Sequence, residues 1–283
     1  MKMTKFNIYE MVTKRILEQL EQGVIPWEKP WNTGALNGAF NRVSKKPYSL
    51  LNQMLLEKTG EYATFKQWQD LGSKIRKGEK SSIVVFWKIQ PIEEEKEDGT
   101  KEIKQIPLLR YYNVFHISQV DGVEPLNIDN RRNDIEPIER AEQVMNDYIS
   151  REGITLENVF GNDAFYSPAR DYIRLPELQQ FSDVSEYYST AYHECVHSTG
   201  HKSRLDRLDK TARFGNEEYS KEELTAEIGS SAIMNYLGLE TKHSFRNSVG
   251  YIQNWCSVLR SDPKFIVSAS SRADKAVNYI LGL

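Results

Sequence analysis

The chain has 283 residues, of which 39% are hydrophobic and 27% charged, and its formal net charge is -3. A hydrophobic content near the globular average excludes a largely disordered chain, and no apolar run approaches the roughly 18 to 20 residues that a membrane helix needs. The first residues lack the apolar segment of a signal peptide, and two cysteines cannot form a disulfide framework. We therefore expect a cytoplasmic protein with no membrane partner, long enough for two domains.

Basic and acidic residues divide unevenly along the chain. Residues 1–125 contain 19 Lys and Arg against 16 Asp and Glu, whereas the remainder contains 18 against 24. Six of the 16 acidic residues lie in residues 93–102, between two β-rich runs at residues 82–89 and 109–117. We interpret this acidic segment as the solvated loop of a long hairpin, so the packed part of the first domain is basic.

The remaining elements follow from periodicity and from turn residues. Apolar residues recur at helical spacing from Ile8 to Leu20, which predicts an amphipathic helix. Residues 121–140 are polar, hold two prolines and show no sustained period, which predicts a linker. After it we expect a helix at 139–150, a hairpin of residues 164–166 and 172–175, and helices near 184–198, 221–237, 245–259 and 271–281. The sequence thus predicts an α+β fold with domains at 1–122 and 139–283, joined by a linker at 123–138.

One short motif carries the chemistry of the second domain. Residues 193–197 read His-Glu-Cys-Val-His and match the pattern His-Glu-x-x-His. On a helix, His193 and His197 project from one face, so both imidazoles can reach one tetrahedral ion. Glu194 lies one residue on, where its carboxylate can accept the proton of a water on that ion. The competing interpretation is an exposed helix whose histidines only form local pairs.

A third protein ligand has to come from elsewhere in the chain. A metzincin would have a histidine six residues after His197, where this chain has Ser203, so that class is excluded. Downstream, Glu223 and Glu227 share one face of a predicted helix, and small residues that permit close packing follow. In gluzincins a Glu on such a second helix completes a His-His-Glu site. We favour Glu227 as the ligand, with Glu223 as its support or as the alternative ligand, unless this acidic face is merely solvated. The expected ion is Zn2+, or Mn2+ in a mixed nitrogen and oxygen site.

Aromatic and basic residues alternate in the first domain. Flat side chains stack on unpaired bases while cations contact phosphates, so single-stranded DNA is the expected partner. A basic recognition helix, typical of proteins that read duplex DNA in the major groove, is not evident. The competing interpretation is that these aromatics form the core of a small domain. The residues assigned to the DNA surface are Trp27, Lys29, Trp31, Lys45, Lys46, Tyr48, Lys66, Arg76, Lys77 and Lys80.

Several longer motifs point to one family. They include Leu-Glu-Gln-Gly-Val-Ile-Pro-Trp-Glu-Lys-Pro-Trp at 20–31, Ile-Arg-Lys-Gly-Glu at 75–79, Tyr-Ser-Thr-Ala-Tyr-His-Glu at 188–194 and Glu-Glu-Leu-Thr-Ala-Glu at 222–227. In these motifs the chain resembles, over nearly its full length, the ArdC antirestriction family, whose N-terminal part also occurs in TraC-type plasmid primases. The resemblance implies an N-terminal domain that binds single-stranded DNA and a C-terminal zincin-like metallopeptidase domain. Together they would shield the entering DNA of mobile elements from host restriction.

Three functions are compatible with these features. The protein can bind single-stranded DNA and cut a protein substrate of the host restriction machinery, with Glu194 as the base. It can instead be a DNA-binding shield with a structural metal, or a protease toxin that its DNA domain delivers. Because a catalytic site needs a positioned base, Glu194 favours the first. Residues 172–175 are the candidate edge strand for an extended peptide substrate.

Overall fold

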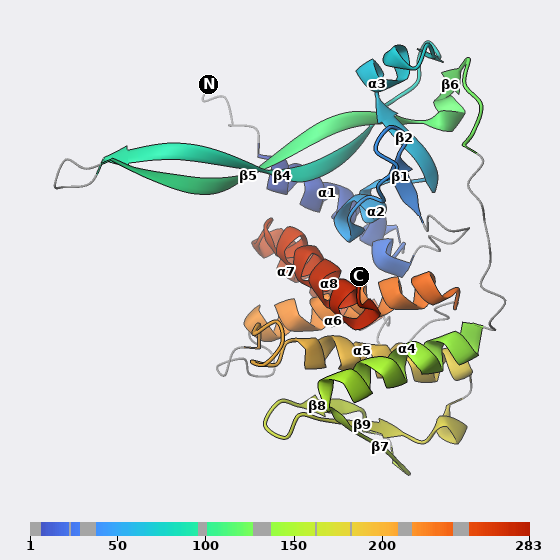
Figure 1. Cartoon of the computed structure of the whole chain (residues 1–283), viewed down its shortest axis with the longest axis vertical. Coiled ribbons are helices and arrows are strands. Elements are labelled where there is room, and N and C mark those ends of the chain that lie inside the picture. The colour runs from blue at the N-terminus through green and yellow to red at the C-terminus, as the bar shows by residue number, and fades with distance from the viewer. Residues whose placement is uncertain are drawn as a thin grey trace.

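A mixed sheet lies at one end of the molecule, and the helices of the second half lie beneath it (Figure 1). The computed structural model describes residues 7–22, 24–28, 38–95, 101–126, 137–161, 163–181, 183–208, 217–239 and 249–283. None of the helices in these ranges combines the length and the apolar character that crossing a membrane requires. The α+β fold with two domains, predicted from the sequence, is confirmed.

The N-terminal domain opens with the predicted amphipathic helix. Helix α1 (Ile8–Glu21) begins at Asn7, whose side chain accepts the backbone N–H of Tyr9 at 3.0 Å. The four-stranded sheet has the order β1-β2-β5-β4, with β1 and β2 parallel and the other pairs antiparallel, and β3 and β6 form a separate ribbon. The elements after α1 are η1 (Pro26–Glu28), β1 (Ala39–Asn41), α2 (Leu50–Leu55), β2 (Gly60–Thr64), α3 (Phe65–Asp70), β3 (Lys74–Ile75), β4 (Ser82–Glu95), β5 (Lys101–His116), η2 (Ile117–Gln119) and β6 (Val120–Asp121).

Strands β4 and β5 form a long hairpin that projects from the body of the molecule (Figure 1). The pairing continues to Glu95 opposite Lys101, so residues 93–95 and 101–102 of the acidic segment that we expected to be a loop are paired strand, and residues 96–100 lie outside the described ranges. At the root, the side chain of Asn52 on α2 bonds both the N–H and the C=O of Val85, which turns these groups away from β5. By the same alternation Pro91 and Pro107 have their nitrogens on the outer edges, so neither proline removes a bond between the two strands.

The C-terminal domain places a small sheet against a layer of helices. Strand β9 (Tyr172–Pro176) is its central strand, parallel to β7 (Thr155–Val159) and antiparallel to β8 (Phe165–Ser167). The prediction that residues 172–175 form a free edge was therefore wrong, because both sides of β9 are already paired, and β7 was not predicted. The helical segments are α4 (Pro137–Glu152), η3 (Leu178–Gln180), α5 (Val184–Thr199), α6 (Glu217–Leu237), α7 (Val249–Ser261) and α8 (Phe265–Leu281).

The predicted linker falls only partly within the described residues. Residues 123–126 have no regular structure, and residues 127–136 lie outside the described ranges. Helix α4 begins at Pro137, so the last two residues of the predicted linker belong to this helix.

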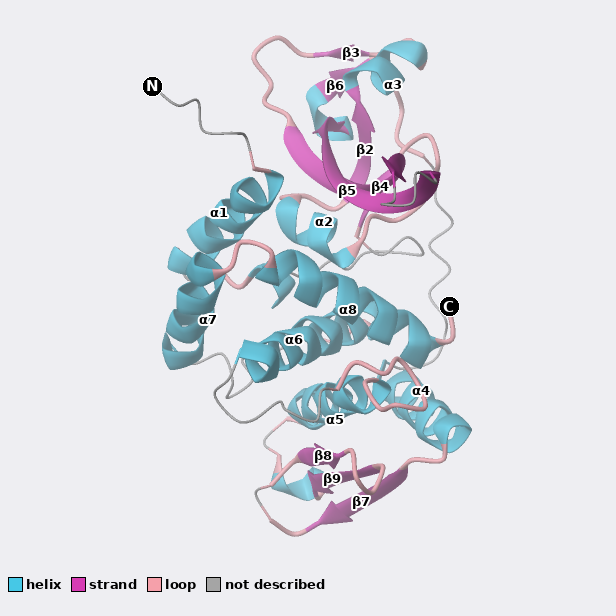
Figure 2. Cartoon of the chain, turned by 90° about the vertical axis from the view of Figure 1, so that its left-hand side faces the viewer, coloured by secondary structure: helices cyan, strands magenta, loops and turns pink. Residues whose placement is uncertain are grey.

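The two domains share one hydrophobic core. Apolar side chains of α1 and α2 lie in the same buried cluster as side chains of α6, α7 and α8. Helix α1 lies beside α7, and α2 lies beside α8 (Figure 2). Three hydrogen bonds between described residues cross this boundary: Thr13 donates to the carbonyl oxygen of Pro263 at 2.8 Å, the N–H of Leu50 donates to Asp274 at 3.1 Å, and Arg260 donates to Glu21 at 2.6 Å. Any movement of one domain therefore acts on the packing of the other.

Candidate metal centre

Helices α5 and α6 approach each other closely at the motif. A Cβ atom added to Gly229 of α6 would lie 2.9 Å from a methyl carbon of Val196 on α5, so only glycine fits this contact without displacement. Next to it, the hydroxyl of Ser230 donates to the carbonyl oxygen of Ser189 at 2.8 Å. The small residues predicted to allow close packing of the two helices therefore do so, and they bring the acidic face of α6 to the histidines.

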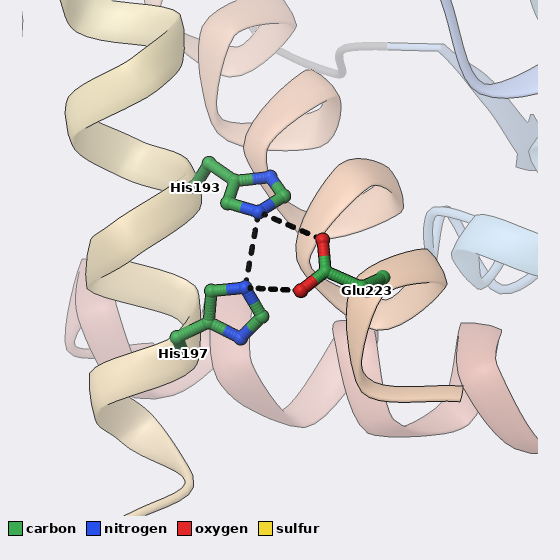
Figure 3. Close-up of side chains that lie close together, drawn as sticks. All are labelled: His193, His197 and Glu223. Carbon is green, nitrogen blue, oxygen red and sulfur yellow. Dashed lines mark hydrogen bonds and ion pairs between the residues drawn. The ribbon is translucent and has the colours of Figure 1, made fainter. Parts of the chain in front are cut away.

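Three side chains converge between the two helices (Figure 3). The Nε2 atoms of His193 and His197 lie 3.0 Å apart. The carboxylate of Glu223 spans both rings, with one oxygen 3.6 Å from Nε2 of His193 and the other 3.5 Å from Nε2 of His197. The ligand atoms that these residues offer thus face a common point.

The donor set fits a divalent ion. Around a tetrahedral Zn2+, bond lengths of about 2.0–2.1 Å place neighbouring ligand atoms about 3.3–3.5 Å apart. The separations in the structure are 3.0, 3.5 and 3.6 Å. Two imidazole nitrogens and one carboxylate also leave a fourth position open, as catalytic rather than structural zinc sites do.

Carboxylates hold the other nitrogen of each imidazole. Nδ1 of His197 lies 3.0 Å from Glu222, and Nδ1 of His193 lies 3.5 Å from Glu227. Arg207 fixes Glu222 with two bonds, from Nε at 2.9 Å and from Nη2 at 2.8 Å. Each carboxylate favours the tautomer with the proton on Nδ1, which leaves the Nε2 lone pair for a metal. Sequence reasoning missed Glu222 and Arg207, because neither belongs to a recognised spacing.

The electrostatics of the cluster favour a cation. Burial alone lowers the pKa of His197, but the carboxylates of Glu222 and Glu223 outweigh it and raise this pKa to about 10. Burial raises the pKa of Glu223, but its bonds to the two histidines hold that pKa far below its usual range. Negative charge is therefore retained among the imidazoles, where a positive ion or a proton can bind.

The geometry reverses the order of the two candidate ligands on α6. The sequence favoured Glu227 as the third ligand, but Glu227 faces Nδ1 of His193 and not the point where the Nε2 atoms meet. Glu223, the alternative, is the acid whose carboxylate lies with the two histidines in the group that could hold an ion. Glu194, the candidate base, is only 3% exposed, and its charge contributes to the raised pKa of His197.

Comparison with known proteins identifies the family. Residues 6–115 match the model of the N-terminal domain of anti-restriction factor ArdC, and residues 140–272 match a zincin-like metallopeptidase. The metal-free crystal structure of the antirestriction ArdC protein from the R388 plasmid has 32% identity and a TM-score of 0.74, covering 97% of each chain. This chain belongs to the ArdC antirestriction family. The Mn(II)-bound structure of the R388 ArdC protein is also similar, with 31% identity, a TM-score of 0.76 and coverage of 98% of each chain.

Relatives with other names are similar to this chain in sequence. The DNA primase TraC of Escherichia coli is 35% identical over 98% of this chain, which spans 20% of the primase. A second TraC primase of Escherichia coli is 34% identical, and the chain spans 27% of it. The uncharacterized protein y4eC of Sinorhizobium fredii (strain NBRC 101917 / NGR234) is 33% identical over 98% of this chain and 92% of its own length.

The residues predicted for DNA binding in this ArdC-family chain differ in their exposure to solvent. Trp27 is 1% exposed and packs in the shared core with Leu224 and Ile228 of α6, so it cannot stack on a base, and its assignment was wrong. Tyr48 is half-buried, and its ring meets Tyr62 edge-on. The bases Lys45, Lys46, Lys66, Arg76, Lys77 and Lys80 are exposed, whereas Lys29 and Trp31 lie outside the described residues.

Proposed function

We propose that this ArdC-family protein protects incoming DNA from host restriction by combining single-stranded DNA binding with a metal-dependent peptidase site. One observation supports the metal site most strongly: His193, His197 and Glu223 converge, while other carboxylates occupy both Nδ1 atoms. That pattern is typical of metal-binding histidines. We expect Zn2+, which suits this donor set. Mn2+ is the alternative, which the Mn(II)-bound form of the R388 relative supports.

In this proposal some protein groups hold the ion and orient its ligands, and Glu194 transfers the proton. A divalent ion at this site would act as a Lewis acid and activate a water molecule. Glu194 would accept the proton at a carboxylate oxygen and deliver it to the leaving amine of the peptide. Glu222 and Glu227 would keep the two imidazoles in place. The substrate we expect is a protein of the host restriction machinery, met in the cytoplasm.

The DNA half of the proposal rests on charge and exposure. Six of the predicted basic side chains are exposed on the N-terminal domain, where phosphates can reach them, although Arg76 among them is already paired with Glu79 and Asp121. The matching DNA primases support a nucleic-acid role for this domain. Buried Trp27 takes no part, so other aromatic side chains must provide any stacking.

The decisive experiment measures restriction of unmodified DNA entering cells that express wild type, Glu194→Gln, Glu142→Gln or no protein at matched levels. Glu142 is an exposed acid on α4 and serves as the control. We expect Glu194→Gln to lose protection, because removing a general base costs about 100- to 10,000-fold in rate. Metal analysis of the purified variant must show that the ion is retained.

The possible results separate the candidate functions. If Glu194→Gln retains its metal and protects as well as wild type, turnover is not needed, and DNA binding with a structural metal is the better explanation. If protection is lost together with the metal, the variant reports ion binding and Glu194 has another role. Loss of protection with the metal retained supports peptide hydrolysis.

A further inference from the structure

The hairpin of β4 and β5 has two chemically different faces. Its register runs without a break from Ser82 opposite Val114 to Glu95 opposite Lys101. Residues directly opposite each other share a face, and successive residues alternate between faces. Even-numbered residues of both strands therefore lie on one face. We call this face, with Phe86, Lys88, Lys104, Arg110 and Tyr112, the cationic face.

In the stretch of the hairpin next to the body of the protein, charge is confined to one of the two faces. From 84 to 92 on β4 and from 104 to 112 on β5, the even positions hold three basic residues and no acidic one. The odd positions between 83 and 91 and between 105 and 113 hold no charged residue at all. Lys88, Lys104 and Arg110 are all exposed. Glu94 and Glu102 lie opposite each other on the same face nearer the turn, so the cationic face is limited to positions 84–92 and 104–112. This stretch carries only cations and is complementary to a polyanion.

The uncharged face is the one that packs on the body of the protein. Val85 and Leu109 are buried there in the shared core with side chains of α1 and α2. Trp87 on the same face lies 6.4 Å from Tyr9 of α1, measured between ring centroids. The cationic face is therefore on the opposite side of the hairpin from α1.

An exposed aromatic stack lies among the cations. The rings of Phe86 and Tyr112 are nearly parallel, with an angle of 5° between their planes and 4.6 Å between their centroids. Tyr112 is 54% exposed, so its ring is accessible to a further planar group. Arg110 lies directly opposite Phe86, and Lys88 is the next residue along β4 on this face. Stacking rings flanked by cations are the combination that binds unpaired bases and their phosphates.

The cationic face continues toward residues that the sequence had assigned to DNA. Val84 and Val114, at its inner end, belong to one buried cluster, and Tyr48 packs against this cluster. The exposed Lys45 and Lys46 directly precede Pro47 and Tyr48 in the chain.

We infer that the cationic face binds single-stranded DNA, with a base stacked on Tyr112 and phosphates on Lys88 and Arg110. This inference rests on the proposed DNA-binding function and gives it a location outside the residues predicted from sequence. Duplex DNA fits this surface poorly, because its paired bases present no free face for Tyr112. The partner is recognised by unpaired bases and by charge, so little sequence preference is expected.

The test measures binding of a fluorescein-labelled oligothymidine to the full-length protein by fluorescence anisotropy. Tyr112→Ala should weaken binding roughly 5- to 100-fold, the loss expected for one stacked base. Tyr111→Ala is the matched control. Tyr111 is the neighbour of Tyr112 on β5 and is also exposed, but it lies on the opposite face of the hairpin. Tyr112→Phe keeps the ring and should bind like wild type, which separates stacking from any loss of folding.

The contribution of the cations Lys88 and Arg110 is measured separately, from the dependence of oligonucleotide affinity on salt concentration. For single strands the slope of log K against log salt changes by about 0.7 for each phosphate contact. Lys88→Gln with Arg110→Gln should therefore flatten the slope by about 1.4. The charge-matched control Lys14→Gln with Lys202→Gln removes two exposed cations elsewhere and should leave the slope as in wild type.

The outcomes distinguish this location from the function on which it rests. If wild type binds the oligonucleotide but Tyr112→Ala binds as tightly, or Tyr111→Ala is equally weakened, the cationic face is not the DNA site and the proposed function stands. The same conclusion follows if the double variant and its control have equal slopes. If wild type shows no affinity for single strands, the DNA half of the proposed function fails, and this inference fails with it.

Discussion

The assignment of Glu223 as the third ligand can be tested against Glu227 with two isosteric substitutions. Glu223 contacts Nε2 of both histidines, whereas Glu227 contacts only Nδ1 of His193. Glu223→Gln removes a charged ligand atom and should weaken ion binding by more than about 100-fold. Glu227→Gln keeps an oxygen that can accept the Nδ1 proton, so the loss should stay within the 10- to 100-fold, or about 1.4–2.7 kcal/mol, typical of groups that orient metal-bound histidines.

Competition with a chromogenic chelator measures these affinities on the metal-stripped protein, for Zn2+ and Mn2+ separately. Glu142→Gln, an exposed change on α4, controls for general effects of removing an acid. Thermal unfolding of each stripped variant shows whether the site residues still pack. A larger loss for Glu227→Gln than for Glu223→Gln would refute the assignment and restore the order that the sequence had favoured.

Three further outcomes follow from packing and charge. Gly229→Ala should lower the thermal midpoint and weaken ion binding, because overpacking costs about 1–3 kcal/mol and exceeds the gain of about 1 kcal/mol in helix propensity. Adding Val196→Ala should restore the thermal midpoint and the ion affinity. Arg207→Gln should destabilise the metal-free protein by about 3–5 kcal/mol in chemical denaturation, since the buried carboxylate of Glu222 loses its guanidinium partner, and no change would contradict this pairing. Burial raises the pKa of Asp274 to about 6, so the folded state takes up the proton first, and wild type gains stability as pH falls from about 6 to about 4. The free energy of unfolding of Asp274→Asn should therefore exceed that of wild type by up to about 3 kcal/mol at pH 7 and equal it at pH 4. Urea unfolding at both pH values measures this difference.

Local patterns predicted most of the elements. The helices around the metal site and the two histidines follow from the period of 3.6 residues, which a single segment encodes without reference to the rest of the chain. The hairpin of β4 and β5 was predicted from its β-rich runs. Its length was not, because the acidic residues from Glu93 to Glu95 look solvated in sequence although their backbone is paired.

The remaining features depend on packing between segments that are distant in the sequence, which sequence patterns do not encode. Glu223 and Glu227 differ by only about 40° around the helix axis, so helical spacing cannot tell which one faces the ion. The rotation of α6 that turns Glu223 toward the two Nε2 atoms is constrained by the contact of Gly229 with Val196 of another helix. Trp27 likewise looked like a stacking residue because its burial partners lie about 200 positions further along the chain.

Helix α6 links these two differences between the sequence-based expectation and the structure. Its acidic face carries Glu223 to the histidines, and the adjacent Leu224 is fully buried in the core that contains Trp27. A rotation of α6 that moved Glu223 away from the ion position would also withdraw Leu224 from the N-terminal domain. Trp27, which the sequence had assigned to the DNA surface, therefore stabilises α6, the helix that carries the candidate ligand Glu223. The proposed DNA-binding domain and the candidate metal centre share one core, so substitutions on either side have to be compared in the full-length chain.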